Sequence, residues 1–489
     1  MAKSYKSGNP AVRAGYNPSM VESGNSKKQQ TIGLLGAIAI GLASMLGAGV
    51  FVVFHSAYLV SQGGYYWALG LAALVASLNA WAIYSLARQV DRPGGVYSYS
   101  RHYLNHTSSF LAGFAFVFGK IGSIAAIALA LGTYLAPGAG TVPSALAIVL
   151  LTLVNIMGIQ RTALMSAILA VLTGGYLFIL GIAGLQVPAY NALTQTDFSQ
   201  GLNPVSIAGA AAIFFFAFAG YARVATLGNE VRKPKRTIPT AIVISLVIVV
   251  GLYFLLAFVV LKFDGVNLVL INAPISNVAS LIFMGSPLAG WVVPVAVLAC
   301  LGSMLALLAG VSRTSAVMAE DRELPKFFAV RNKRGVPYRA ELVIAAGAIA
   351  LTAIGDLTWV IGFSSFSVLF YYAFGHMTVL RQPAKERVMP KWVAWVGFAL
   401  CALLAAAIPG PAVPVSAAIL LLAYLFRMDV VNKRSGKRRF GRGSGAAMSV
   451  VNEMFQPSAA NAAVIIEEKR EARKAMPAPE DKLKPGSED

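Results

Sequence analysis

The chain has 489 residues, of which 57% are hydrophobic and only 12% are charged. Since about a quarter of the residues in an average soluble domain are charged, this composition indicates a membrane protein, as does a mean hydropathy of +0.68. The formal charge is +20, yet the Lys and Arg residues lie in the connections between apolar runs, which excludes nucleic-acid binding as the main activity. Cys300 and Cys401 lie inside apolar runs and frame neither a disulfide scaffold nor a thiolate metal site.

The chain begins with a polar segment, residues 1–30, which we expect to be a disordered cytoplasmic tail. The apolar run that follows starts at Ile32 and is too long for a cleavable signal peptide. A helix needs about 20 apolar residues to cross a bilayer, and about twelve runs are candidates for such spans. They are residues 32–61, 65–87, 108–135, 142–159, 163–186, 205–230, 238–261, 289–318, 340–355, 357–380, 392–409 and 411–427. Residues 268–287 are a further candidate for an external re-entrant or surface helix.

The distribution of basic residues predicts the orientation, because cytoplasmic loops carry an excess of Lys and Arg. With the N-terminus inside, all but three of the 40 Lys and Arg residues fall in internal segments. The exceptions are Lys262 in an external loop, and Lys120 and Arg223 within spans. We therefore expect a multi-pass protein of the cytoplasmic membrane with both termini in the cytoplasm.

Beyond the transmembrane domain, residues 31–428, the remaining residues 429–489 are expected to form a basic, mostly disordered cytoplasmic tail. Its basic cluster, Lys433 to Arg442, is of the kind that anionic lipid headgroups attract. A stop signal that follows the positive-inside rule is the simpler interpretation, and we favour it.

Two spans contain glycine-rich interruptions, and an interruption at membrane depth needs a reason because backbone groups there have no water to bind. The first has a glycine-rich stretch from Ser44 to Phe51, and the sixth has one from Phe216 to Tyr221. Transporters with inverted repeats break a helix at matching places in each half and bind substrate between the half-helices. Small-residue packing explains either interruption alone, but their spacing of five helices favours a binding site.

Four segments carry a family resemblance: GLASMLGAGVF (41–51), RPGGVYSYSR (92–101), FFFAFAGYARVATLGNEVRKPKRTIPTAI (214–242) and SRTSAVMAEDRELPKFF (312–328). Over roughly residues 30–428 the chain resembles the amino acid–polyamine–organocation family of secondary transporters. The resemblance implies an all-α integral membrane fold of about twelve transmembrane helices. It also implies that these helices form a LeuT-type five-plus-five inverted repeat in which helices one and six are broken.

The resemblance also implies a substrate site at the two breaks. The substrate carboxylate is expected on backbone N–H groups of the first break, and its ammonium on carbonyls of the second. An aromatic residue of the sixth span is expected to close over the substrate. The corresponding residues are Gly47, Ala48 and Gly49 for the carboxylate, Ala217, Phe218 and Ala219 for the ammonium, with Gly220 in the same break, and Phe216 for the lid.

The chain departs from the family pattern at two positions. Many members have an acidic residue directly after the Gly-aromatic pair of the sixth span, where this chain has Ala222 and then Arg223. Many also have one late in the second span, where this chain has Ser85. The carboxylates on which some proton-coupling schemes depend are thus absent from these positions.

Lys120 lies near the middle of the third span, and an ionisable residue at that depth is a functional hypothesis by default. It is a candidate to replace a coupling cation, to carry a coupled proton, or to contact a substrate carboxylate. Hydrogen bonding to carbonyls for packing alone is the structural alternative. Arg223 and Glu230, seven residues apart, are expected to form a gating pair.

These features predict a secondary transporter that imports or exchanges an α-amino acid by alternating access. Proton coupling is favoured over sodium coupling, and no cofactor, metal or catalytic residue is expected. A polyamine or cationic amino acid is the second candidate substrate, disfavoured by the two buried cations. A membrane-embedded enzyme and a channel are more distant alternatives. Besides substrate, proton and membrane lipid, the sequence indicates no partner.

Overall fold

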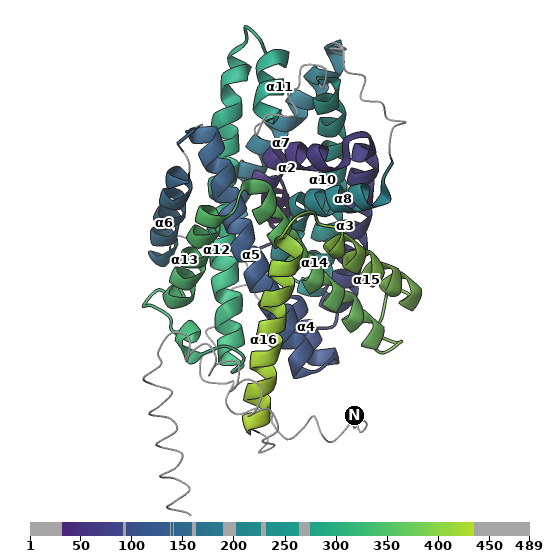
Figure 1. Ribbon diagram of the computed structural model, residues 1–489, viewed down its shortest axis with the longest axis vertical. Helices are drawn as coiled ribbons and strands as arrows, with labels where there is room; N and C mark the ends of the chain where they lie inside the picture. Colours follow the sequence, from purple (N-terminus) through teal and green to yellow (C-terminus); the bar gives the residue numbers. More distant parts are fainter. Residues whose placement is uncertain are drawn as a thin grey trace, which may run out of the picture. The chain divides into compact units, whose positions relative to one another are not determined.

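The predicted apolar runs all contain α-helix in the computed structural model, which describes residues 32–90, 94–136, 138–139, 141–158, 163–188, 202–225, 231–263 and 274–434 (Figure 1). Within these ranges the β-pairing consists of one isolated bridge between Ile32 and Val231. The predicted all-α membrane fold is confirmed at this level. The tails that we expect to be disordered, residues 1–30 and most of 429–489, lie outside the described residues.

The described helices of the first half of the chain end shortly before residue 190. They are α1 (Leu34–Met45), α2 (Ala48–Ser61), α3 (Tyr65–Ala87), α4 (Val96–Tyr103), α5 (His106–Leu135), α6 (Val142–Ile156) and α7 (Ala163–Gln186). The second half begins with the interrupted helix of the sixth predicted span. Its elements are α8 (Pro204–Phe218), the 3-10 turn η4 (Ala219–Tyr221), α9 (Ala222–Ala225), α10 (Pro234–Lys262), α11 (Pro274–Ile282), α12 (Val292–Glu320), α13 (Tyr338–Ile354), α14 (Leu357–Arg381), α15 (Lys391–Ala406) and α16 (Ala412–Arg434).

Seven of these helices are long and apolar enough to cross a bilayer. An eighth span results if α1 and α2, which meet at a bend of 41°, are counted as one. α6, α15 and the apolar part of α16 are shorter, so the predicted total of about twelve spans and the inverted repeat stay predictions. The expected external helix within 268–287 is represented by the short α11.

Residues Met1–Leu420 form one compact unit, and Leu421–Asp489 form a second, of which only the end of α16 is described. In the first unit α5 and α14 are the central helices. In the apolar stretch of each, 78% of the residues are buried, whereas the corresponding share for α7 is 39%. The outward side chains of α7 include Leu164, Val171 and Phe178, all exposed. Exposed apolar side chains in such numbers suit a surface that contacts lipid, because lipid imposes no penalty on them.

Small residues allow the central helices to approach closely. α5 packs against α14, and a Cβ added at Gly119 would lie 2.8 Å from the Cβ of Ser367. A Cβ at Gly122 would lie equally close to the ring of Phe363. Glycine at these positions of α5 therefore sets the distance between the two helices, as in other membrane bundles.

The two interruptions predicted from the sequence lie directly against each other. A Cβ at Gly49, in the first turn of α2, would lie 2.8 Å from the Cα of Ala217 in α8. A Cβ at Gly220, in η4, would overlap the carbonyl of Ser44 and lie 2.7 Å from the nitrogen of Met45. Backbone thus meets backbone at both contacts, and neither position has room for a side chain.

We expect Gly220→Ala to destabilise the protein by about 1–3 kcal/mol, the usual cost of overpacking a site that cannot relax. The matched control is Gly251→Ala in α10, where an added Cβ has no neighbour within 4 Å. That control should unfold at the same temperature as the wild type or higher, because alanine favours helix over glycine. Thermal unfolding in detergent measures both, and equal melting temperatures for the two variants would contradict the close contact at Gly220.

Candidate substrate site

A cavity lies where the two broken helices meet, and α5 and α12 complete its wall. Its lining residues come from five stretches of the chain: Ser44, Met45 and Gly49; Phe116, Lys120, Ser123 and Ile127; Phe216, Ala217, Ala219 and Gly220; Arg223; and Ser303, Ala306, Leu307, Gly310 and Val311. Most of the site residues expected from the sequence are therefore brought together around one space.

Two of the expected site residues that the structure describes, Gly47 and Phe218, do not line this cavity. Gly47 faces α12, where an added Cβ would overlap Ser303. The ring of Phe218 packs against Tyr253, with centroids 5.0 Å apart. Ala48 is the first residue of α2, and Glu230 lies outside the described residues, so the predicted Arg223–Glu230 pair stays a prediction.

The first break presents the start of a helix to the cavity. α1 ends at Met45 and α2 begins at Ala48, so the N–H groups around Gly47–Gly49 belong to a helix N-terminus. The N–H groups of a first helical turn have no carbonyl one turn before them, and the helix dipole adds partial positive charge there. This geometry suits a carboxylate, as helix N-termini do in general.

The second break differs in form from the expected unwound segment. α8 ends at Phe218 and tightens into the 3-10 turn Ala219–Tyr221, before the short α9. A 3-10 turn keeps most backbone groups engaged, so this break exposes fewer carbonyls than extended backbone does. Ala219 nitrogen donates to the Phe215 carbonyl, in the regular helical direction.

Side chains from other helices bind the carbonyls that the breaks release. The Tyr253 hydroxyl of α10 is 2.6 Å from the Met45 carbonyl oxygen and 3.4 Å from that of Ala217. The Ser303 hydroxyl of α12 is 3.5 Å from the Ala43 carbonyl oxygen. The sequence analysis did not single out Tyr253, although a tyrosine within the aliphatic run of residues 241–261 was an available signal.

Lys120 contacts the second break directly. Its side chain, on α5, is only 4% exposed, and Nζ donates a hydrogen bond of 3.3 Å to the Ala219 carbonyl. Throughout the described part of the chain, no Asp or Glu carboxylate forms an ion pair with this ammonium. The ammonium therefore lies at the cavity with a single backbone acceptor for its three N–H groups.

Apart from Lys120 and Arg223, the described residues of the cavity wall are apolar or carry neutral hydroxyls. All three lining serines already bond within the protein: Ser303 to the Ala43 carbonyl, Ser44 to the Ile40 carbonyl, and Ser123 to the Ser364 hydroxyl at 2.7 Å. Arg223 lines the cavity opposite Gly310, where an added Cβ would lie 3.7 Å from Arg223 Cδ. Among the described lining residues two are basic and none is acidic.

Ser85, near the end of α3, forms hydrogen bonds with neutral groups. Its hydroxyl donates to Gln382 Oε1 at 2.7 Å, and it accepts from the Val388 nitrogen at 3.1 Å. The Gln382 amide donates in return to the Ser85 carbonyl. A pair of neutral side chains thus joins the end of α3 to the end of α14, where many family members place a charge.

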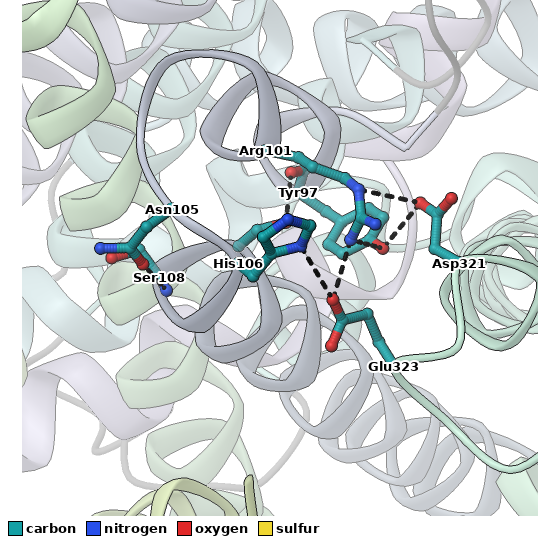
Figure 2. A network of polar contacts seen from close by, with 8 residues as sticks. Tyr97, Arg101, Asn105, His106, Ser108, Asp321 and Glu323 are labelled. Carbon is teal, nitrogen blue, oxygen red and sulfur yellow. Dashed lines mark hydrogen bonds and ion pairs between the residues drawn. The ribbon is translucent and has the colours of Figure 1, made fainter. Parts of the chain in front are cut away.

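A second polar cluster joins two of the sequence segments that carry the family resemblance (Figure 2). Arg101 of α4 donates to Glu323 at 2.8 Å and lies 3.7 Å from Asp321, beyond the end of α12. Tyr97 donates to Asp321 at 2.8 Å, and His106 lies 3.6 Å from Glu323. Burial and the charge of Asp321 raise the pKa of Tyr97, so its hydroxyl remains a donor. The cluster fixes α4 to α12 outside the cavity.

These helices and their shared cavity define a helical membrane transporter, and comparison with known proteins gives its family. Residues 32–426 match the amino acid permease family, and the chain belongs to it. Membership in the amino acid–polyamine–organocation group, predicted from four segments, is thereby confirmed.

The relatives are transporters of several kinds. An uncharacterized transporter of Mycobacterium tuberculosis is 40% identical over 80% of this chain and 89% of its own length. The serine/threonine exchanger SteT of Bacillus subtilis is 24% identical over 74% of this chain and 86% of its own. The chloroplastic cationic amino acid transporter 6 of Arabidopsis thaliana is 24% identical over 71% and 64%, respectively.

We expect Tyr253→Phe to lower stability by about 1–3 kcal/mol, because it leaves the Met45 carbonyl buried without its donor. The control is Tyr176→Phe, which removes a hydroxyl bond of 3.2 Å to the Leu288 carbonyl away from both breaks. The Tyr176 hydroxyl is only partly buried, so water can replace it and the loss should be smaller. Thermal unfolding in detergent compares the two, and an equal or smaller loss for Tyr253→Phe would contradict its role at the breaks.

Proposed function

We propose that this protein carries an α-amino acid across the cytoplasmic membrane by alternating access, as proton-coupled uptake or exchange. The observation that carries the proposal is the meeting of two broken helices around one cavity. The start of α2 and residues Ala217 and Ala219 of the second break line the same space, and backbone N–H groups and carbonyls are complementary to the carboxylate and ammonium of an amino acid. Membership in the amino acid permease family supports the same substrate class.

In this proposal the substrate carboxylate binds N–H groups of the stretch Gly47–Gly49, of which Gly49 lines the cavity. The ammonium binds carbonyls of the stretch Ala217–Ala219, whose first and last residues line the cavity, and Phe216 covers the substrate. The carbonyls of Ala217 and Ala219 already accept from Tyr253 and Lys120, but a carbonyl has two lone pairs and can accept a second donor. Phe216 lines the cavity and is 9% exposed, so its ring is available to contact a bound substrate.

Proton coupling is supported by the surroundings of Lys120. Its ammonium already binds a backbone carbonyl at the break. A sodium ion bound there would need oxygen atoms of this kind as ligands. Lys120 is also the one described titratable side chain that is both buried and on the cavity wall. We infer that it carries the coupled proton, with Arg223 and Glu230 at the gate towards the cytoplasm.

The second candidate substrate, a polyamine or cationic amino acid, is favoured by the name of the Arabidopsis relative. The cavity disfavours it, because the described lining residues offer two basic side chains and no carboxylate to a further cation. The name of the Bacillus relative, a serine/threonine exchanger, supports a substrate without a positive side chain.

The experiment that tests the function is a screen of the purified protein against the twenty amino acids and common polyamines. Thermal stabilisation identifies ligands, and uptake into liposomes then shows whether a ligand is transported. We expect saturable uptake that an imposed proton gradient drives and that replacing sodium with potassium leaves unchanged. Unsaturable flux, as in a channel, or the absence of any amino acid ligand would overturn the proposal.

We expect Phe216→Ala to weaken substrate binding by about 1–3 kcal/mol, the range for losing a buried aromatic contact. Phe178→Ala is the control, because Phe178 is 56% exposed on α7 and lies away from the cavity. The measurement is the dissociation constant of the amino acid that the screen identifies. Wild-type affinity in the Phe216 variant would remove this residue from the site.

Lys120→Ala should abolish accumulation against a gradient, while exchange at equal pH on both sides survives. Lys120→Arg keeps the charge but cannot release its proton, so it should lose accumulation in the same way. The measurement is uptake against external pH for wild type and both variants in liposomes. Wild-type rates with unchanged pH dependence in both variants would exclude Lys120 from coupling.

A further inference from the structure

Within the described residues, the ammonium of Lys120 has no carboxylate partner. Its side chain is 96% removed from solvent, and its single hydrogen bond goes to the neutral carbonyl of Ala219. A buried charge is costly unless it is paired, and one carbonyl does not neutralise an ammonium. In the described part of the chain, the positive charge of Lys120 is therefore not balanced by a negative charge.

The cavity wall, as far as the structure describes it, contains no acidic side chain. The described lining residues include the basic Arg223 as well as Lys120, and their other polar side chains are neutral serines. Ser123 is next to Lys120 by one helical turn, but its hydroxyl is bonded to Ser364 and to the Gly119 carbonyl. Among the described lining residues there is thus no carboxylate to pair with the ammonium of Lys120.

We propose that the substrate is an acidic amino acid, whose side-chain carboxylate pairs with the ammonium of Lys120. This inference rests on the proposed amino acid transport and names its substrate class. The α-carboxylate remains at the start of α2, and the second carboxylate binds at η4. These two positions are close, because Gly49 touches Ala217 and Lys120 binds Ala219 two residues further on. A short dicarboxylate such as aspartate or glutamate spans them.

Other side chains fit the cavity less well. A cationic side chain adds like charge beside Lys120 in a region of low dielectric. A neutral side chain leaves the ammonium with a single acceptor, whereas a carboxylate accepts charge-assisted hydrogen bonds from it. The apolar walls formed by Phe116, Ile127 and Leu307 strengthen that pairing by excluding water.

The test compares each acid with its own amide, because the two are nearly identical in shape and differ in charge. Binding of L-glutamate against L-glutamine, and of L-aspartate against L-asparagine, is measured on the purified full-length protein at fixed pH and salt. We expect the wild type to bind at least one acid about tenfold or more tighter than its amide. Equal binding, or a preference for both amides, overturns the inference and needs no variant to show it.

Variants then assign the preference to Lys120. Lys120→Met should bind acid and amide within about threefold of each other, whereas Lys120→Arg should keep part of the preference for acid. The matched control is Lys262→Met: Lys262 donates to three carbonyls at the end of α7, and it lies outside the cavity. This control should keep the wild-type ratio, and a Lys120→Met protein that also keeps it contradicts the pairing.

The outcomes separate this inference from the function on which it rests. If neutral amino acids bind and are transported in preference to acids, the protein is an amino acid transporter and the inference about charge is wrong. If neither acids, amides nor any other amino acid bind, the proposed function itself fails.

Discussion

A helix that is interrupted inside a bilayer exposes backbone groups that no water can satisfy, and this constraint governs the centre of the molecule. Each break here has a specific solution. The carbonyls at the end of α1 receive the hydroxyls of Tyr253 and Ser303, and the start of η4 receives the ammonium of Lys120. The N–H groups of the first turn of α2 have no acceptor within their own helix and are available to a ligand.

The same constraint explains why glycine and alanine surround the breaks. Any side chain at Gly49 or Gly220, even a methyl group, would push α2 from α8 or η4 from α1. The Tyr253 hydroxyl contacts both α1 and α8, and it depends on their short separation. Close packing and hydrogen bonding therefore depend on each other: the short distance brings two helices within reach of one hydroxyl, and that hydroxyl stabilises the short distance. α5 contributes to both, through Lys120 at the break and through glycines against α14.

Much of the helix arrangement could be predicted from the sequence, because membrane helices are recognisable by their length and apolarity. The helix at 65–87 was predicted with the bounds that α3 has, and both interruptions lie where glycine marked them. Tyr253 was missed because one tyrosine in an apolar run has no periodicity or motif, and only the fold shows that its hydroxyl reaches α1 and α8. The 3-10 form of the second break was equally hidden, because α-helical and 3-10 turns share the same residue preferences.

Tyr253 also joins the two broken helices to each other. Its hydroxyl oxygen lies 2.6 Å from the Met45 carbonyl oxygen of α1 and 3.4 Å from the Ala217 carbonyl oxygen of α8, and its single proton is the only one it can donate. Because one hydroxyl cannot follow two helices, a separation of α1 from α8 at this level would leave one of the two carbonyls without this donor.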